Sequence, residues 1–298
     1  MPYSVARHLF SPKFAAIHRT ILNPLLKRMG PAGPATISME QARVLQGQFP
    51  RRDGYRYDRE AKRARATGRA DSLLEVTRGV SVHRCLEFGA GDGHVALELT
   101  GRGLHCDTAD IVDWRDEEVR QSGVRHCEAR DNTLSCDEAE YDLVFSYNTF
   151  EHVEDPEAAL RELVRVVRPG GVIYLSFGPL FNAPFGLHAY RTVYFPYPQF
   201  LLDADNVEQF VAQFGIEDLG CRRNTFQYVN GWSMARFKEL FSRADLGVSR
   251  SVVETIADYS AVGMIYRHLP CFVNRGVDFD ELTTDSLVVT LTVDEHPA

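Results

Sequence analysis

A short apolar run that ends in three closely spaced glycines constrains this chain most. Residues 82–88 read VHRCLEF, and Gly89, Gly91 and Gly93 follow within the next five positions. Glycine adopts backbone angles that other residues avoid, so this pattern is typical of a tight turn between a strand and a helix. The spacing is G-x-G-x-G rather than G-x-G-x-x-G, which disfavours a dinucleotide-binding turn.

Apolar runs alternate with helical segments after this turn. Strands are predicted at residues 82–88, 104–110, 124–130, 141–147 and 172–177, with later candidates at 247–256 and 285–294. Helices are predicted at residues 94–103, 156–171 and 233–247. This alternation predicts an α/β fold with a doubly wound, mostly parallel sheet of about seven strands. Ligands bind at the carboxyl edge of such a sheet, so the glycine turn lies where a ligand is expected.

The charge of the chain is distributed unevenly. The 298 residues carry a net charge of -8, but residues 1–69 hold 14 basic and 4 acidic residues and are therefore +10. We expect a basic helical N-terminal extension over residues 1–79 and a second domain over residues 80–298. Proline, glycine and aromatic residues are frequent after the fifth predicted strand, which indicates an irregular cap or insertion at about residues 179–232. The basic and acidic parts either serve different purposes or dock on each other.

Composition excludes several classes of protein. The six cysteines are widely spaced without a C-x-x-C pair, which disfavours zinc ribbons and disulfide scaffolds and favours a reducing compartment. No apolar run approaches the ~20 residues that a membrane span requires. The first residues lack the apolar core and cleavage site of a signal peptide. We therefore expect a cytoplasmic protein.

Three motifs, in the same order along the chain, resemble those of the class I S-adenosylmethionine-dependent methyltransferases. The segment CLEFGAGDG at residues 85–93 resembles the first motif of the family, and Asp110 falls where the family has its ribose-binding acid. The segments YDLVFSYNTFEHV at residues 141–153 and RVVRPGG at residues 165–171 resemble the later motifs. The wording of residues 151–171 is most similar to the branch that includes ubiquinone-biosynthesis O-methyltransferases. The resemblance implies a Rossmann-like methyltransferase fold and S-adenosylmethionine as the cofactor.

The resemblance also implies which residues contact the cofactor. The glycines would shape the pocket on the methionine side, and Glu87 would lie near the amino group. Asp110 would hold the ribose, and Asn148 would lie beside the reactive methyl group. The full set of implied cofactor contacts is Glu87, Gly89, Ala90, Gly91, Gly93, Asp110, Ile111, Asp131, Asn132 and Asn148.

The acceptor side is predicted from residues after the fourth and fifth strands. His188 is the candidate general base, because it follows the fifth strand near the expected ligand edge. A loop histidine that only forms hydrogen bonds is the alternative. Candidate acceptor contacts are Tyr190, Arg191 and Tyr194, whose alternative role is packing within a cap. His152, in the turn after the fourth strand, is a further candidate, although a structural role is favoured for it. The fourth and fifth strands end without the acidic ligands of a catechol-type site, so we predict no catalytic metal.

These observations predict methyl transfer to a small or medium-sized acceptor, lipid-linked acceptors included, with oxygen as the nucleophile. The fourth strand is followed by Asn-Thr-Phe-Glu, not by the Asn/Asp-Pro-Pro-Tyr of base methyltransferases, which disfavours a nucleic acid. An RNA or protein methyltransferase that docks through its basic N-terminus is one alternative, and a non-catalytic cofactor-binding module is another. Residues 1–39 contain no acid and could contact a membrane surface, although packing over the active site is favoured. The sequence does not predict the oligomeric state.

Overall fold

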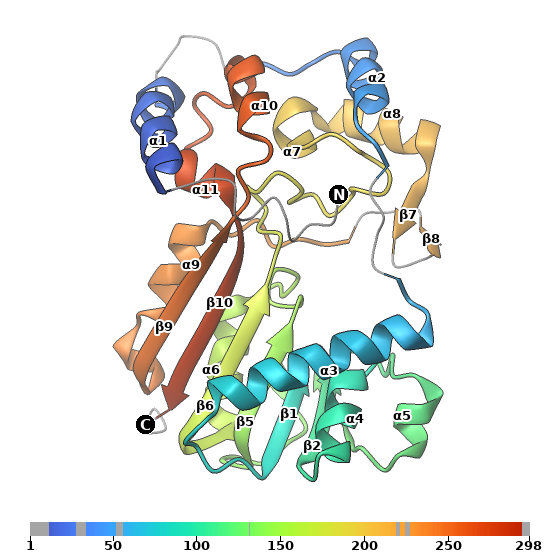
Figure 1. Cartoon of the computed structure of the whole chain (residues 1–298), viewed down its shortest axis with the longest axis vertical. Helices are drawn as coiled ribbons and strands as arrows, with labels where there is room; N and C mark the ends of the chain where they lie inside the picture. The colour runs from blue at the N-terminus through green and yellow to red at the C-terminus, as the bar shows by residue number, and fades with distance from the viewer. Residues whose placement is uncertain are drawn as a thin grey trace. The chain divides into compact units, whose positions relative to one another are not determined.

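The chain forms two compact units. The computed structural model describes residues 12–27, 34–51, 56–130, 132–218, 221–223 and 227–293 (Figure 1). Unit 1 comprises Met1–Tyr55, Gly178–Ala235 and Thr255–Ser286, and unit 2 comprises Arg56–Phe177, Arg236–Glu254 and Leu287–Ala298. Each unit is described by itself. The division cuts across the expected domain boundary at residue 79, which stays a prediction.

Unit 2 is built on an eight-stranded sheet with the order β4-β3-β2-β1-β5-β6-β10-β9. The strands are β1 (Arg84–Phe88), β2 (His105–Asp110), β3 (His126–Arg130), β4 (Thr133–Leu134), β5 (Tyr141–Tyr147), β6 (Val167–Phe177), β9 (Val248–Ala257) and β10 (Thr284–Val293). Neighbours from β3 to β6 pair in parallel, whereas β4 and β10 pair antiparallel to β3 and β6. The doubly wound, mostly parallel sheet is confirmed. The eighth strand is β4, whose two residues are too short to form a periodic pattern.

The strand order reverses direction at β1. β1 pairs in parallel with β2 on one side and with β5 on the other. Successive strands therefore leave β1 toward one edge of the sheet and return at β5 to build the other half. The crevice at such a switch point is where open α/β sheets bind ligands. This topology brings the turns that follow β1 and β5 to the same edge of the sheet.

Helices cover both faces of the sheet of unit 2. They are α3 (Arg59–Val76), α4 (His94–Gly101), α5 (Glu117–Gln121), α6 (Pro156–Val166), α9 (Met234–Phe241) and the 3-10 turn η2 (Ala244–Leu246). Leu73 of α3, Leu99 of α4 and Val119 of α5 pack in one core cluster with Phe145 of β5. In Figure 1, α3 crosses in front of the sheet and α6 lies behind it. The predicted helix at residues 156–171 ends at Val166, because the following residues already belong to β6.

Unit 1 is mainly helical. Its elements are α1 (Pro12–Leu26), α2 (Met39–Gln48), α7 (Pro198–Leu201), α8 (Ala204–Phe214), β7 (Ile216–Asp218), β8 (Cys221–Arg223), α10 (Val262–Arg267), the 3-10 turn η3 (Leu269–Cys271) and α11 (Phe279–Thr283). One core cluster joins distant parts of the chain, because Leu22 of α1, Phe195 and Leu282 of α11 all pack in it. Ser38 starts α2 with a reciprocal capping box to Gln41. Among the described residues, no helix has the length and apolar character needed to cross a membrane.

The segment that follows β6 is irregular. Residues 178–197, all of them described, contain no helix or strand, as their proline and aromatic content predicts. The prediction of an irregular region up to residue 232 is too long, because α7, α8, β7 and β8 lie within it. Side chains order residues 178–197. The buried Gln46 of α2 donates from Nε2 to Thr192 O over 2.7 Å and accepts from Tyr194 N over 2.9 Å. The Tyr197 hydroxyl donates to Leu282 O over 2.9 Å.

Candidate functional site

The glycine turn after β1 adopts the conformation that its sequence predicts. Gly89, Gly91 and Gly93 have φ angles of +68°, +51° and +74°, in the left-handed region. A Cβ atom added at Gly89 would lie 2.2 Å from Thr149 Cγ2, in the turn after β5. Only glycine therefore fits between these two turns. At Gly91 an added Cβ would meet no atom of the described residues within 4 Å, so space remains beside the backbone there.

The end of β2 holds this turn in place. Gly89 N and Ala90 N donate to Ala109 O over 2.8 Å and 3.2 Å. Asp110 accepts from Gly91 N over 3.0 Å and from Ile111 N over 2.8 Å, one bond to each carboxylate oxygen. Burial raises the pKa of Asp110. Each oxygen can accept a further hydrogen bond, so Asp110 orders the turn and remains able to bind a ligand hydroxyl.

Glu87 is a buried acid directly before the turn. Glu87 belongs to β1 and is 4% exposed. Its Oε2 accepts a hydrogen bond from Ala96 N of α4 over 2.9 Å. Burial raises the pKa of Glu87 to about 8. The carboxyl group is therefore mostly neutral at pH 7, and a nearby positive charge would favour its ionised form.

The turn after β5 completes the switch point. Thr149 Oγ1 lies 3.2 Å from Gly89 O, and Ser146 Oγ donates to Phe88 O over 2.8 Å. Asn148 has a φ angle of +53°, donates its backbone N–H to Ser176 O over 2.8 Å and exposes its side chain. The structure thus brings together the predicted residues of β1, β2 and β5.

Ile111 and Asn132, two further predicted cofactor residues, lie in exposed loops. Ile111 is 73% exposed, directly after Asp110. Asn132 has a φ angle of +60° in the exposed turn between β3 and β4. Asp131 lies outside the described residues.

The sequence did not single out Arg69 and Tyr147. The Arg69 guanidinium lies 4.5 Å from the centre of the Tyr147 ring, and the Tyr147 hydroxyl donates to Arg69 O over 3.1 Å. The positive charge of Arg69 also acts to lower the pKa of Glu87, against the larger effect of burial. Arg69 ends a run of basic residues, and only its place in the folded helix distinguishes it from the others.

The other basic residues of α3 are largely paired with acids of unit 2. Arg63 lies 2.8 Å from Glu118, and Arg59 pairs with the same carboxylate. Lys62 Nζ lies 2.6 Å from Asp116 Oδ2, which also bonds to Nε2 of the buried His94 over 2.9 Å. A hollow of about 430 Å³ lies along these pairs and is lined by Tyr57, Arg59, Lys62, Asp116, Glu117, Glu118 and Gln121. None of the predicted cofactor residues lines it.

The acceptor-side candidates belong to both units. In unit 1, His188 has a φ angle of +56°, and its Nε2 donates to Pro179 O over 2.8 Å. Tyr190, Arg191 and Tyr194 are half-buried in the same irregular segment.

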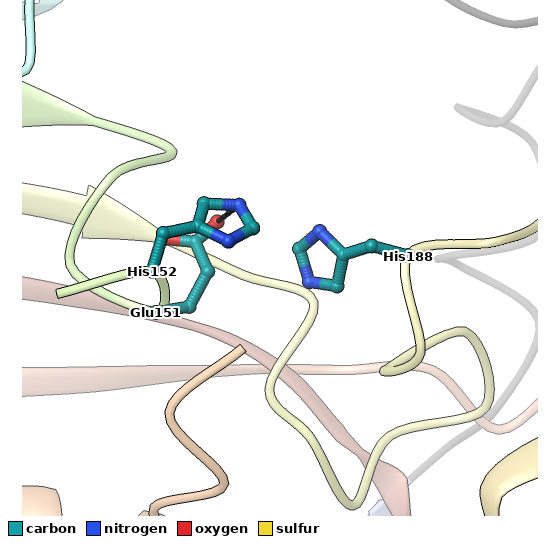
Figure 2. Close-up of side chains that lie close together, drawn as sticks. All are labelled: Glu151, His152 and His188. Carbon is teal, nitrogen blue, oxygen red and sulfur yellow. Dashed lines mark ion pairs between the residues drawn. The ribbon is translucent and has the colours of Figure 1, made fainter. Parts of the chain in front are cut away.

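In unit 2, His152 follows the turn after β5, and its Nε2 lies 3.9 Å from Oε1 of the buried Glu151 (Figure 2). His152 N also donates to Thr149 O over 2.8 Å, which ties it to the turn that contacts Gly89. Figure 2 draws these two side chains together with His188 of unit 1. The absence of a catalytic metal stays a prediction.

Comparison with known proteins places the chain in a family. A family model for a methyltransferase domain matches residues 51–246. The chain is 35% identical over 104 residues to a tRNA 5-carboxymethoxyuridine methyltransferase of Escherichia coli, covering 32% of this chain and 40% of that protein. It is 34% identical over 134 residues to a malonyl-[acyl-carrier protein] O-methyltransferase of Halorhodospira halophila, covering 42% and 45%. The chain thus matches less than half the length of these two relatives.

A solved structure is also similar. The PH0226 protein of Pyrococcus horikoshii has 15% sequence identity and a TM-score of 0.48, covering 80% of this chain and 95% of that one. The matched family model includes the whole glycine turn, Asp110 and the turn after β5. The chain belongs to the S-adenosylmethionine-dependent methyltransferase family.

Proposed function

We propose that this methyltransferase acts on the oxygen of a small or medium-sized acceptor. S-adenosylmethionine, when bound, supplies a methyl group already activated by a positively charged sulfur. The chain then has to align the acceptor with that methyl group, exclude water and accept a proton where the acceptor carries one. The name of the malonyl-[acyl-carrier protein] O-methyltransferase supports oxygen as the methylated atom.

The switch point of unit 2 supports the proposed cofactor contacts. Asp110 would accept hydrogen bonds from the ribose hydroxyls in addition to the two backbone bonds that it already accepts. Glu87 would face the amino group of the cofactor, and the open backbone at Gly91 would lie against its methionine part. Ile111, Asp131 and Asn132 would contact the adenine, and Asn148 would lie near the methyl group. Arg69 is a further candidate, because its positive charge suits the cofactor's carboxylate.

We propose His188 as the general base. Its Nε2 donates to Pro179 O, so in the neutral ring Nδ1 is the nitrogen that can accept a proton. That hydrogen bond and the positive φ angle of His188 would orient the ring. Tyr190, Arg191, Tyr194 and His152 would bind the acceptor in this proposal.

The ion pairs of the basic residues of α3 are the observation that favours a small acceptor over a nucleic acid. A surface that binds RNA needs cations available to phosphate groups. Arg59, Lys62 and Arg63 instead form ion pairs with Asp116 and Glu118. A tRNA acceptor is the second candidate, because the Escherichia coli relative is named a tRNA methyltransferase.

Membrane contact through residues 1–39 also stays a prediction. On α1, Ile17 is 58% and Ile21 46% exposed; Lys13 of the same helix and Lys27, directly after its end, are also exposed. Arg19 is held by an ion pair with Asp280 at 2.6 Å and is less available to a lipid headgroup. This arrangement supports a weak, reversible contact, which suits a lipid-linked acceptor.

A methyl-transfer assay tests the choice of acceptor. The full chain is incubated with labelled S-adenosylmethionine and, in separate reactions, with hydroxyl- and carboxyl-bearing small molecules or total tRNA. We expect salt-insensitive transfer to a small acceptor that His188→Asn reduces and Arg59→Gln leaves unchanged. Transfer to tRNA that is lost at high salt and in Arg59→Gln would instead support the RNA methyltransferase.

A further inference from the structure

Two cysteines face each other across the edge hairpin of unit 2. β3 and β4 pair antiparallel. Ser135 extends this pairing, because its N–H donates to Glu128 O over 3.1 Å. One further step in the same register would set Cys127 of β3 opposite Cys136, which lies in the bend just after β4. Because the pair at residues 128 and 135 is hydrogen-bonded, the cysteines would then occupy a non-hydrogen-bonded position, at which side chains lie closer together.

This position suits a disulfide bond. Opposed residues at a non-hydrogen-bonded site have Cα atoms about 4.5 Å apart, within the range of about 4.4–6.8 Å that disulfides span. The sulfur atoms also converge on one hydroxyl group. Tyr141 Oη lies 3.7 Å from Cys127 Sγ and 3.6 Å from Cys136 Sγ. A bond between the two sulfurs therefore requires little movement of the strands.

The surroundings make Cys127 the more nucleophilic thiol. A hydrogen bond with Cys136 lowers the pKa of Cys127 to about 7, and the Tyr141 hydroxyl and the positive charge of Arg125 act in the same direction. The thiolate is the form of cysteine that attacks oxidants. Cys127 is 1% and Cys136 9% exposed. They lie beside β4, a two-residue strand at the edge of the sheet, and short edge elements open locally more easily than the interior of a sheet.

We propose that Cys127 and Cys136 form an oxidation site, at which a hydroperoxide produces a reversible disulfide that locks the β3–β4 hairpin. The Cys127 thiolate attacks the terminal peroxide oxygen and the O–O bond breaks. A sulfenic acid forms, and hydroxide, or the alkoxide of an organic hydroperoxide, leaves. The Cys136 thiol then attacks the sulfenic sulfur, the S–S bond forms, and water leaves. The two sulfurs lose two electrons to the peroxide, and a dithiol reductant reverses the change.

A second pair of cysteines in the same sheet provides a control. Cys85 and Cys106 are neighbours in the register of β1 and β2. They are 0% and 2% exposed, and burial raises the pKa of Cys106. These two strands lie in the interior of the sheet, so the Cys85–Cys106 pair should resist an oxidant that reaches the hairpin.

The experiment treats the folded full-length chain with hydrogen peroxide, blocks remaining thiols and maps peptides without reduction. We expect one cross-linked peptide pair, Cys127 with Cys136, which dithiothreitol separates. Hydrogen exchange at residues 126–136 should slow by about tenfold in the oxidised form. Cys136→Ser should stop the reaction at a sulfenic acid on Cys127 that a dimedone probe captures, whereas Cys106→Ser should oxidise as the wild type does.

Two outcomes would overturn the proposal. One is a folded chain in which Cys127 and Cys136 stay fully alkylatable after peroxide treatment. The other is oxidation of Cys85 and Cys106 at the same rate, which would indicate general unfolding. If Cys136→Ser does not fold, as judged by circular dichroism, Cys136→Ala provides the same sulfenic acid test. None of these readouts depends on methyl transfer or on cofactor binding.

Discussion

Unit 2 and unit 1 are ordered by interactions of different range. In unit 2, the strands β1 to β6 all lie between residues 84 and 177, and the helices α4, α5 and α6 alternate with them along the chain. In unit 1, one core joins Leu22, Phe195 and Leu282, which come from three separate stretches of chain. Local periodicity therefore describes unit 2 well, whereas unit 1 depends on side-chain bonds between distant positions. Substitutions in unit 2 should therefore act mainly on the local turns, and substitutions in unit 1 mainly on contacts between distant parts of the chain.

Gly89→Ala should reduce stability and cofactor binding the most, because it disrupts the contact between the turns after β1 and β5 of unit 2. The new Cβ would lie 2.2 Å from Thr149 Cγ2 at a φ angle of +68°. We expect a loss of about 2–4 kcal/mol of unfolding free energy and no measurable cofactor binding by calorimetry. Gly91→Ala is the matched control, since it carries only the strain of a positive φ angle, about 1–2 kcal/mol. If the two variants had equal unfolding free energies, the close contact between residue 89 and Thr149 would contribute nothing to the effect.

Asp110→Ala should weaken cofactor binding more than it weakens the fold. It removes a carboxylate proposed to bind the ribose and two hydrogen bonds to backbone N–H groups. We expect the affinity for S-adenosylhomocysteine to fall about 10- to 100-fold, which corresponds to the binding free energy of one pair of charge-assisted hydrogen bonds. Asp71→Ala, which removes an exposed partner of Arg102, is the control and should leave affinity unchanged. An Asp110→Ala chain with wild-type affinity would remove Asp110 from the proposed site.

Gln46→Ala tests the long-range order of unit 1. The side chain is buried and bridges Thr192 O and Tyr194 N, so the variant removes both of these hydrogen bonds. We expect a loss of about 1–3 kcal/mol in urea unfolding and reduced turnover, with unchanged S-adenosylhomocysteine affinity. The exposed Gln48→Ala should change stability by less than about 0.5 kcal/mol. A Gln46→Ala variant that loses cofactor affinity instead would contradict the placement of all proposed cofactor contacts in unit 2.

Cofactor affinity should rise with pH through Glu87. Burial raises the pKa of Glu87 to about 8, so the carboxyl group must lose a proton before it can pair with the cofactor's ammonium group. Affinity should therefore increase between pH 6 and pH 8, by at most about tenfold per pH unit. Glu87→Gln should bind more weakly and without this pH dependence. Calorimetry in two buffers with different ionisation heats checks the release of the proton, and a flat wild-type profile would reject this role.

The same pKa predicts the opposite trend for stability. The unfolded chain loses the Glu87 proton near pH 4.5, whereas the folded chain retains it until about pH 8. The contribution of this group is complete at low pH and is lost as the pH rises between these values. Urea unfolding of the wild type and Glu87→Gln across this range should show the difference between the two proteins.

Gly68→Ala should have the smallest effect and should stabilise the chain. Gly68 lies inside α3, and an added Cβ would meet no atom of the described residues within 4 Å. We expect a gain of about 0.5–1 kcal/mol, the difference in helix propensity. Gly47→Ala in α2 of unit 1 has equally open surroundings and is the matched variant. If the units unfold in separate transitions, each variant should shift only one of them.

The sequence predicted the sheet and much of the proposed cofactor site because both depend on local signals. All seven predicted strands are present in the sheet, and the turn at Gly89 has the positive φ angle that its glycine suggests. Asp110 contacts that turn because parallel pairing of β1 and β2 brings their carboxyl ends together.

The sequence could not predict features that depend on distant contacts. The bridge from Gln46 to Thr192 spans 146 positions, and no periodic pattern marks either residue. Arg69 resembles the other basic residues of its run, and only the folded helix places it against Tyr147. β4 has two residues and α5 has five, which is too short for a periodic pattern. Their secondary structure therefore depends on the neighbouring parts of the fold more than on their own residues.

Calorimetric titration of the full chain with S-adenosylhomocysteine and with NAD tests the central claim most directly. The glycine turn, Glu87 and Asp110 predict binding of S-adenosylhomocysteine, weaker binding by Asp110→Ala and no binding of NAD. A folded chain that binds NAD, or that binds neither ligand, would contradict the assignment of the unit 2 switch point as the cofactor site.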